Sequence, residues 1–351
     1  MVIDLESWAN TPTFALAAFV VSMALTFGVT RYARAHLLDL PGRRRSHAQP
    51  TPRGGGLGFV IALLTCGLLP HVRADPTTTS LLGTALIAVA AVGFWDDHES
   101  QPAHRRLAVQ LFAAGLTVLA LKPTLGFAPG SPMALASLIA CGLAIVWSIN
   151  LHNFMDGIDG LLAVQALFVC STLAIVAQQS TSFALAGLCA ISFAAIAGFV
   201  PLNFPRARIF MGDVGSATLG LWLGILLIMS VESAGLEPSA ALVLVSAFTI
   251  DATMTLMLRL VQKRRWYSAH REHLYQWLVR SGSSHTRVTG LYMLWNLLVV
   301  VPTLWVMMHL STDAAWLVAI AVHTAGITIW LSARRYCLSL TRIRGGRDVA
   351  A

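Results

Sequence analysis

The sequence predicts an all-α, polytopic integral membrane protein with about eleven transmembrane helices. Of its 351 residues, 56% are hydrophobic and only 11% are charged, whereas roughly 25% of the residues are charged in an ordinary soluble domain. Apolar stretches near the length of about 20 residues that a bilayer requires recur along nearly the whole chain. In addition, 22 of the 24 lysines and arginines fall on one side of the membrane if the spans alternate in direction.

Eleven apolar segments account for the predicted transmembrane helices. The first follows Asp4 and Glu6 rather than a basic region, and precedes Arg31 and Arg34, so we expect it to remain as an anchor rather than to be cleaved as a signal peptide. The eleven segments lie near residues 12–30, 57–73, 80–95, 106–121, 132–149, 161–178, 183–201, 217–231, 239–259, 288–309 and 315–332.

The distribution of positive charge predicts the orientation of these helices. With the N-terminus outside and the C-terminus inside, Arg73 and Lys122 are the only basic residues in external segments. Positive loops are retained in the cytoplasm, so we expect an N-out, C-in protein. Membrane topology then explains the net charge of +8, and no nucleic-acid partner is expected.

No soluble domain of useful size is apparent. We expect one membrane domain at residues 1–333 and a basic cytoplasmic tail at 334–351. The spacing of the five cysteines suggests neither a disulfide framework nor a metal site. Both a monomer and a homodimer are compatible with the sequence. The expected cytoplasmic loops are 31–56, 96–106, 150–160, 203–215 and 260–287.

The first of three acidic clusters ends the third predicted span, in the sequence G-F-W-D-D-H. Its Asp96 and Asp97 lie at a helix C-terminus, where a negative charge is disfavoured. A metal ion, or the nearby Arg105 and Arg106, would compensate them. The alternative is that both aspartates are solvated charges that mark the end of the span.

The second cluster has the sequence N-L-H-N-F-M-D-G-I-D-G and begins at Asn150. Asn150 and Asn153 share one helical face, and the two glycines can end the helix and fold Asp159 back toward Asp156. Amides and carboxylates bind hard cations and sugar hydroxyls. Turn formation alone explains the glycines but not this density of polar side chains.

The third cluster, F-M-G-D-V-G-S, precedes a span that runs outward from the cytoplasm. Helix N-termini favour anions, and Asp213 or Ser216 suits an N-cap. A capped helix without further function is the alternative.

Basic and glycine-rich segments are expected to contact phosphate groups. Basic side chains and exposed glycine amides bind phosphates, although retention in the cytoplasm explains much of the positive charge. His270 and His273 have no third nitrogen or sulfur ligand nearby, so zinc is not expected. The candidate residues are His47, Arg53, Gly54, Gly55, Gly56, His270, Arg271 and His273.

Asp251 lies inside the ninth predicted span, where an unpaired charge is costly. Two roles remain open: lining an active cleft, or forming an ion pair with Arg259.

Taken in order, five motifs resemble those of the polyprenyl-phosphate N-acetylhexosamine-1-phosphate transferases, glycosyltransferase family 4. They are P-T-P-R-G-G-G, G-F-W-D-D, N-x-x-N-F-M-D-G-x-D-G, F-M-G-D-x-G-S and H-R-E-H-L-Y-Q, between about Asp39 and Gln276. The final histidine motif is similar to the branch that starts O-antigen and other surface polysaccharides rather than the peptidoglycan-precursor branch. One departure is Ser100, where the family often has lysine, and Arg105 or Arg106 could supply that cation. The run of histidines is also reduced to two.

The resemblance implies transfer of N-acetylhexosamine-1-phosphate from a UDP-sugar to undecaprenyl phosphate, with release of UMP and use of Mg²⁺ or Mn²⁺. We expect Asp213 to bind the metal that holds the diphosphate, with Asp97 nearby as a second metal ligand. Membrane lipids would surround the protein. Asp96 would position groups or relay a proton, or act as a nucleophile; the acceptor phosphate is already largely ionised at pH 7, which favours direct attack. The implied catalytic residues are Asp96, Asp97, Asp156, Asp159 and Asp213, and Asn150, Asn153 and Ser216 join the basic and glycine residues in binding substrate.

Two other classes of protein fit the apolar composition. A transporter or lipid flippase predicts binding residues near the membrane midplane, whereas the acidic motifs here gather on one face. A structural scaffold gives no reason for repeated Asp-Gly and Gly-Asp pairs.

Overall fold

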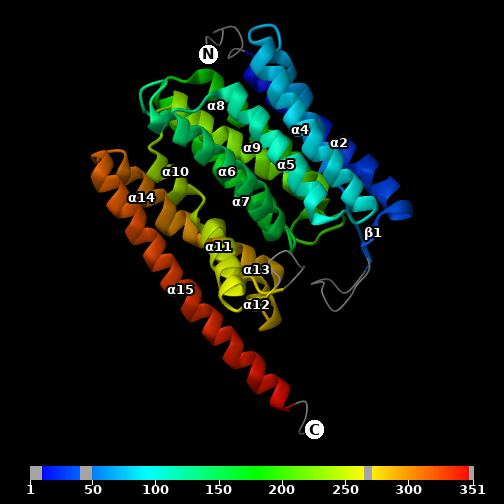
Figure 1. Ribbon diagram of the computed structural model, residues 1–351. Coiled ribbons are helices and arrows are strands. Elements are labelled where there is room, and N and C mark those ends of the chain that lie inside the picture. Colours follow the sequence, from blue (N-terminus) through cyan, green and yellow to red (C-terminus); the bar gives the residue numbers. More distant parts are fainter. Residues whose placement is uncertain (1–9, 40–49, 265–270, 348–351) are drawn as a thin grey trace.

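The computed structural model describes residues 10–39, 50–264 and 271–347, and these residues form a bundle of helices (Figure 1). The strands are Leu38–Asp39 (β1) and Thr51–Pro52 (β2), which pair antiparallel. The helices are α2 (Thr11–His36), α3 (Leu57–Ala62), η1 (Leu63–Leu68), η2 (Leu69–His71), α4 (Pro76–His98), α5 (Ala103–Leu121), α6 (Pro132–Met155), α7 (Leu161–Gln179), α8 (Phe183–Asn203), α9 (Gly212–Ser233), α10 (Pro238–Leu244), α11 (Ser246–Val261), α12 (Leu274–Arg280), α13 (His285–Trp295), η3 (Asn296–Val300), α14 (Val301–Met307) and α15 (Thr312–Arg347).

The predicted all-α, polytopic membrane fold is confirmed. In the described part of the chain, eight helices are long and apolar enough to cross a membrane, and α10 with α11 would add a ninth span bent by 80°. Leu57–His71 is a shorter apolar helix, and α5 carries two arginines in its first turn. Neither segment is among the eight helices counted as candidate spans, so the count of eleven stays a prediction. The N-out, C-in orientation also stays a prediction.

Helix α9 is the centre of the bundle, packed against α4 and α6. In its apolar stretch 83% of the residues are buried, compared with 22% for α2. Small residues allow helices to approach closely in a membrane: a Cβ added to Gly220 would lie 2.6 Å from the carbonyl oxygen of Ser148. Peripheral helices instead expose apolar stripes, such as Leu135, Ile139 and Leu143 along α6, which suit contact with lipid tails.

The connections bring several helix ends to one end of the bundle, which we call the polar end. It contains the C-terminal ends of α4 and α6 and the N-terminal ends of α5 and α9. The loop before α3 closes this end, because the amides of Gly55 and Gly56 donate to the carbonyls of Phe210 and Met211 (both 2.9 Å). All three acidic clusters therefore lie near one another.

Candidate active site

Asp97 binds the N-terminus of α9. Its Oδ1 accepts a hydrogen bond from the amide of Asp213 (3.0 Å) and its Oδ2 accepts one from the amide of Val214 (3.1 Å). Arg53 donates to the backbone carbonyl of Asp97 and lies 3.8 Å from its carboxylate. The residue is only 2% exposed, so Asp97 compensates amides that α9 leaves unpaired and is poorly placed for the metal-ligand role expected from the sequence.

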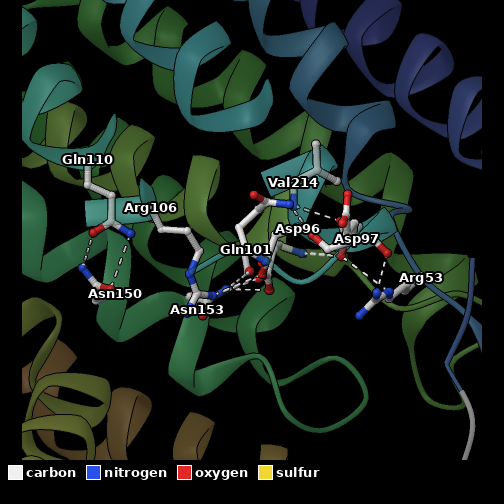
Figure 2. A network of polar contacts seen from close by, with 12 residues as sticks. Arg53, Asp96, Asp97, Gln101, Arg106, Gln110, Asn150, Asn153 and Val214 are labelled. Atoms are coloured by element: carbon white, nitrogen blue, oxygen red, sulfur yellow. Dashed lines mark hydrogen bonds and ion pairs between the residues drawn. The ribbon is translucent and has the colours of Figure 1, made fainter. Parts of the chain in front are cut away.

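Asp96 and Asp213 converge on Arg106, and Figure 2 shows Asp96 and Arg106 within this polar network. The Nη1 atom of Arg106 lies 3.1 Å from Oδ2 of Asp96 and 3.5 Å from Oδ2 of Asp213. The other oxygen of Asp96 accepts from the amide of Gln101. Of the two arginines proposed to supply a cation, Arg106 does so, whereas Arg105 donates to the side chain of Gln101 (3.3 Å).

Asn153 connects α6 to this cluster. Its Nδ2 donates to Oδ1 of Asp213 and to Oγ of Ser216, both at 2.9 Å. Ser216 is 1% exposed, so it orients Asn153 rather than lining an open site. Asn150, one turn earlier, exchanges amide hydrogen bonds with Gln110 of α5 (2.7 and 3.4 Å). The expected face with both asparagines exists, but only Asn153 reaches the carboxylates.

The loop after α6 carries the remaining acidic residues. Asp159 pairs with His285 of α13 (3.3 Å), and the amide of Gly160 donates to Asn203 (3.1 Å). Burial, together with the negative charges of Asp97 and Asp159, raises the pKa of Asp156 to about 7. Asp156 is therefore easier to protonate than an ordinary aspartate.

Helix α12, from the H-R-E-H-L-Y-Q motif, packs against the same loop. The hydroxyl of Tyr275 donates to the carbonyl of Phe154 (2.9 Å). A Cβ at Gly157 would lie 2.0 Å from that hydroxyl oxygen. Glycine is thus required in the Asp-Gly pair for close packing.

Asp251 of α11 accepts hydrogen bonds from backbone amides at the N-terminus of α12. It accepts hydrogen bonds from the Leu274 amide (2.7 Å), the Tyr292 hydroxyl (2.6 Å) and the Trp330 indole (2.9 Å), and is 1% exposed. Arg259 pairs instead with Glu272 (3.1 Å). The pairing with Arg259 suggested by the sequence is therefore replaced by a structural hub that joins four helices.

The expected phosphate-binding histidines and arginine of the H-R-E-H-L-Y-Q motif differ in how accessible they are to a phosphate. His273 is 3% exposed and lies 3.8 Å from Asp251, so a phosphate would reach it only after rearrangement. Arg271 precedes α12, and its carbonyl accepts from Arg280 (3.4 Å). His47 and His270 lie outside the described residues.

The glycine run serves packing. A Cβ at Gly56 would lie 2.3 Å from Cα of Gly215, and the amides of Gly55 and Gly56 are used within the fold. A phosphate would have to displace those bonds. Gly54 has φ of 91°, a left-handed conformation that favours glycine.

Sequence reasoning missed several partners of the candidate residues: Gln101, Gln110, Asn203 and His285. None belongs to a motif with a chemical signature. The i, i+4 spacing of Arg106 and Gln110, which places both polar side chains on one face of α5, is the one signal that would have indicated Gln110.

The cluster fits a divalent cation in part. Two carboxylate oxygens already converge on one positive group, the guanidinium of Arg106. In residues 10–39, 50–264 and 271–347, no three acidic, histidine or cysteine side chains form a ready metal site. Magnesium is commonly held by one or two carboxylates, with waters and substrate phosphates completing the sphere. The donor set suits that mode, in which Asp213 and Asp96 would be the ligands.

The fold and the polar end together define a polytopic membrane protein with a carboxylate–arginine centre at one end of its helix bundle. Residues 79–231 match the model of glycosyl transferase family 4. The chain is 30% identical to the decaprenyl-phosphate N-acetylglucosaminephosphotransferase of Mycolicibacterium smegmatis, over 81% of this chain and 76% of that protein. The chain belongs to this family.

Two further relatives have names that refer to different transferred groups. The undecaprenyl-phosphate alpha-N-acetylglucosaminyl 1-phosphate transferase of Yersinia pestis is 29% identical over 75% of each chain. The phospho-N-acetylmuramoyl-pentapeptide-transferase of Lactiplantibacillus plantarum is 29% identical over 58% of this chain and 71% of that protein.

Proposed function

We propose that this enzyme transfers N-acetylhexosamine-1-phosphate from a UDP-sugar to undecaprenyl phosphate. The products are UMP and the lipid-diphosphate-linked first sugar of an O-antigen or another surface glycan. The observation that carries the proposal is the convergence of Asp96 and Asp213 on Arg106, with Asn153 alongside, in a chain whose relatives are named for this reaction.

The coverage of the relatives favours a simple hexosamine donor. Alignments to relatives named for N-acetylglucosamine transfer cover 75–81% of this chain, whereas those to the two muramoyl-pentapeptide transferases cover 58–61%. The final histidine motif points in the same direction.

In the proposed reaction, an oxygen of the acceptor phosphate attacks the sugar-bearing phosphorus of the donor. The bond from that phosphorus to the bridging oxygen breaks, and UMP leaves with the electron pair. A bound magnesium ion would neutralise the charge that develops on the phosphate oxygens. The acceptor is largely ionised at pH 7, so no side chain has to remove a proton.

The chain's own residues position the reactants. Asp213 and Asp96 would hold the cation with the diphosphate, and Asn153 fixes Asp213 through its Oδ1. Asp97, through the amides of α9, fixes the backbone on which Asp213 lies. Asp156 and Asp159 remain candidates for contacts to the nucleotide sugar.

An apolar cavity offers room for part of the acceptor's chain. It has a volume of about 430 Å³, lies between α11, α12, α13 and α15, and is lined by side chains such as Leu278, Leu294, Leu298 and Ile329. Leu274 of α12, the helix that packs on the loop after α6, also lines it.

We assign the enzyme to the bacterial inner membrane, with the polar end in the cytoplasm. Arg53, Arg105 and Arg106 lie at this end, and basic residues near membrane spans favour a cytoplasmic location. A water-soluble UDP-sugar and a membrane-anchored phosphate would meet there.

The test is release of UMP by purified protein given undecaprenyl phosphate, Mg²⁺ or Mn²⁺, and each member of a panel of UDP-N-acetylhexosamines. We expect release with at least one donor, dependent on the lipid. A transporter or flippase would release none, and that result across the whole panel would refute the proposal.

A further inference from the structure

We propose that Arg106 is a diphosphate-binding residue that exchanges partners during the cycle. In the structure its guanidinium lies between Asp96 and Asp213. When a divalent cation and the donor bind, it leaves Asp213 and donates to the donor's phosphate oxygens. This inference rests on the proposed function and adds a specific residue and step to it.

The first support is how the two carboxylates are held. One oxygen of Asp96 accepts from the Gln101 amide, and one oxygen of Asp213 accepts from Asn153. The second oxygen of each faces the same Nη1 atom of Arg106, at 3.1 and 3.5 Å. The geometry is that of two anionic ligands prepared for one positive charge.

The second support is the position of the guanidinium. The side chain of Arg106 is 35% exposed, and that of Asp213 is 31% exposed, so a ligand can reach both. A guanidinium has five N–H donors, and both contacts to carboxylates are made by Nη1. The remaining donors suit the planar, two-point recognition of phosphate typical of arginine.

Electrostatics makes the exchange a consequence of cation binding. A divalent ion on Asp96 and Asp213 would replace the guanidinium as their counter-charge and repel it at short range. The diphosphate that arrives with the ion supplies new anionic partners. Arg106 would then stabilise the same phosphates that the cation binds.

The neighbouring Arg105 provides a matched control. It lies in the same turn of α5, but donates to the side chain of Gln101 and stacks over Trp95 at 5.7 Å. It therefore has the same charge and a similar location without touching the carboxylates of the cluster.

The experiment compares Arg106→Gln, Arg106→Lys and Arg105→Gln in purified full-length protein. Binding of Mn²⁺ alone is measured by electron paramagnetic resonance without substrate, and KM and kcat for the UDP-sugar are measured separately. We expect Arg106→Gln to bind Mn²⁺ more tightly than the wild type, because the competing guanidinium is gone. Its KM for the donor should rise roughly 10- to 100-fold, as for loss of a charged hydrogen bond.

The two other variants sharpen the result. Arg106→Lys should retain near-wild-type Mn²⁺ affinity and recover part of the donor affinity, and Arg105→Gln should match the wild type in both. Weaker Mn²⁺ binding in Arg106→Gln, or an unchanged KM, would overturn the inference. If the wild type itself releases no UMP, the proposed function fails, whereas an active wild type with an unaffected Arg106→Gln refutes only the role of Arg106.

Discussion

Asp97 and Asp213 are adjacent in space but differ in what surrounds them. Both oxygens of Asp97 accept from amides of α9 and the residue is 2% exposed, whereas Asp213 points one oxygen at Arg106 and is 31% exposed in its side chain. We expect Asp97→Ala to destabilise the fold by about 1–2 kcal/mol, as for loss of a helix N-cap. Thermal unfolding in detergent measures this.

Asp213→Ala is the control for that comparison. It removes no cap, so its unfolding temperature should stay close to that of the wild type. Equal loss of stability in the two variants would contradict the assignment of separate roles.

Asp156 predicts a pH-dependent stability. Burial and the charges of Asp97 and Asp159 raise its pKa to about 7, whereas an unfolded aspartate ionises near pH 4. Ionisation therefore opposes folding progressively between about pH 4 and pH 7, and this cost is constant above that range. Asp156→Asn removes the cost, so the variant should melt at a higher temperature than the wild type at pH 8.

The same comparison at pH 4.5 should show little difference between Asp156→Asn and the wild type. A constant difference across the range would mean that Asp156 is ionised throughout and that its charge is compensated in the fold.

At the scale of elements, α4 packs so closely against the start of α9 at Gly93 that a side chain has no space there. A Cβ at Gly93 would lie 2.5 Å from the carbonyl oxygen of Asp213, whereas nothing lies within 4 Å of a Cβ at Gly83 on the same helix. We expect Gly93→Ala to destabilise the protein by about 1–3 kcal/mol through overpacking and to displace Asp213, with a large loss of activity. Gly83→Ala should keep both stability and activity, and matching losses in the two variants would contradict this packing.

The sequence predicted the helices and the acidic motifs because both signals are local. Apolar length indicates spans, and carboxylates beside glycines are conspicuous in a sequence with few charges. The partners of these motifs depend on tertiary contacts: Asp97 meets amides 116 and 117 residues away, and Asp159 meets His285. The same limitation made Asp251 ambiguous, since its partners come from α12, α13 and α15.

At the scale of the whole molecule, the predicted orientation can be checked on α15 (Figure 1). Ser311 precedes this helix and Ser339 lies near its other end, and both are exposed. The five native cysteines are buried, so they should react slowly. We expect an impermeant maleimide to label Ser311→Cys in intact cells and to label Ser339→Cys only after permeabilisation; the reverse pattern would invert the topology.

The whole molecule places one carboxylate–arginine centre at the end of a membrane bundle, and we propose that phosphate transfer occurs there. The most direct measurement is UMP release from UDP-N-acetylhexosamine and undecaprenyl phosphate by Asp213→Ala at saturating Mg²⁺, beside the wild type. We predict a loss of about 100-fold or more, as for removal of a group that stabilises transition-state charge, with an unfolding temperature close to that of the wild type. Near-normal UMP release by a folded Asp213→Ala protein would contradict the account.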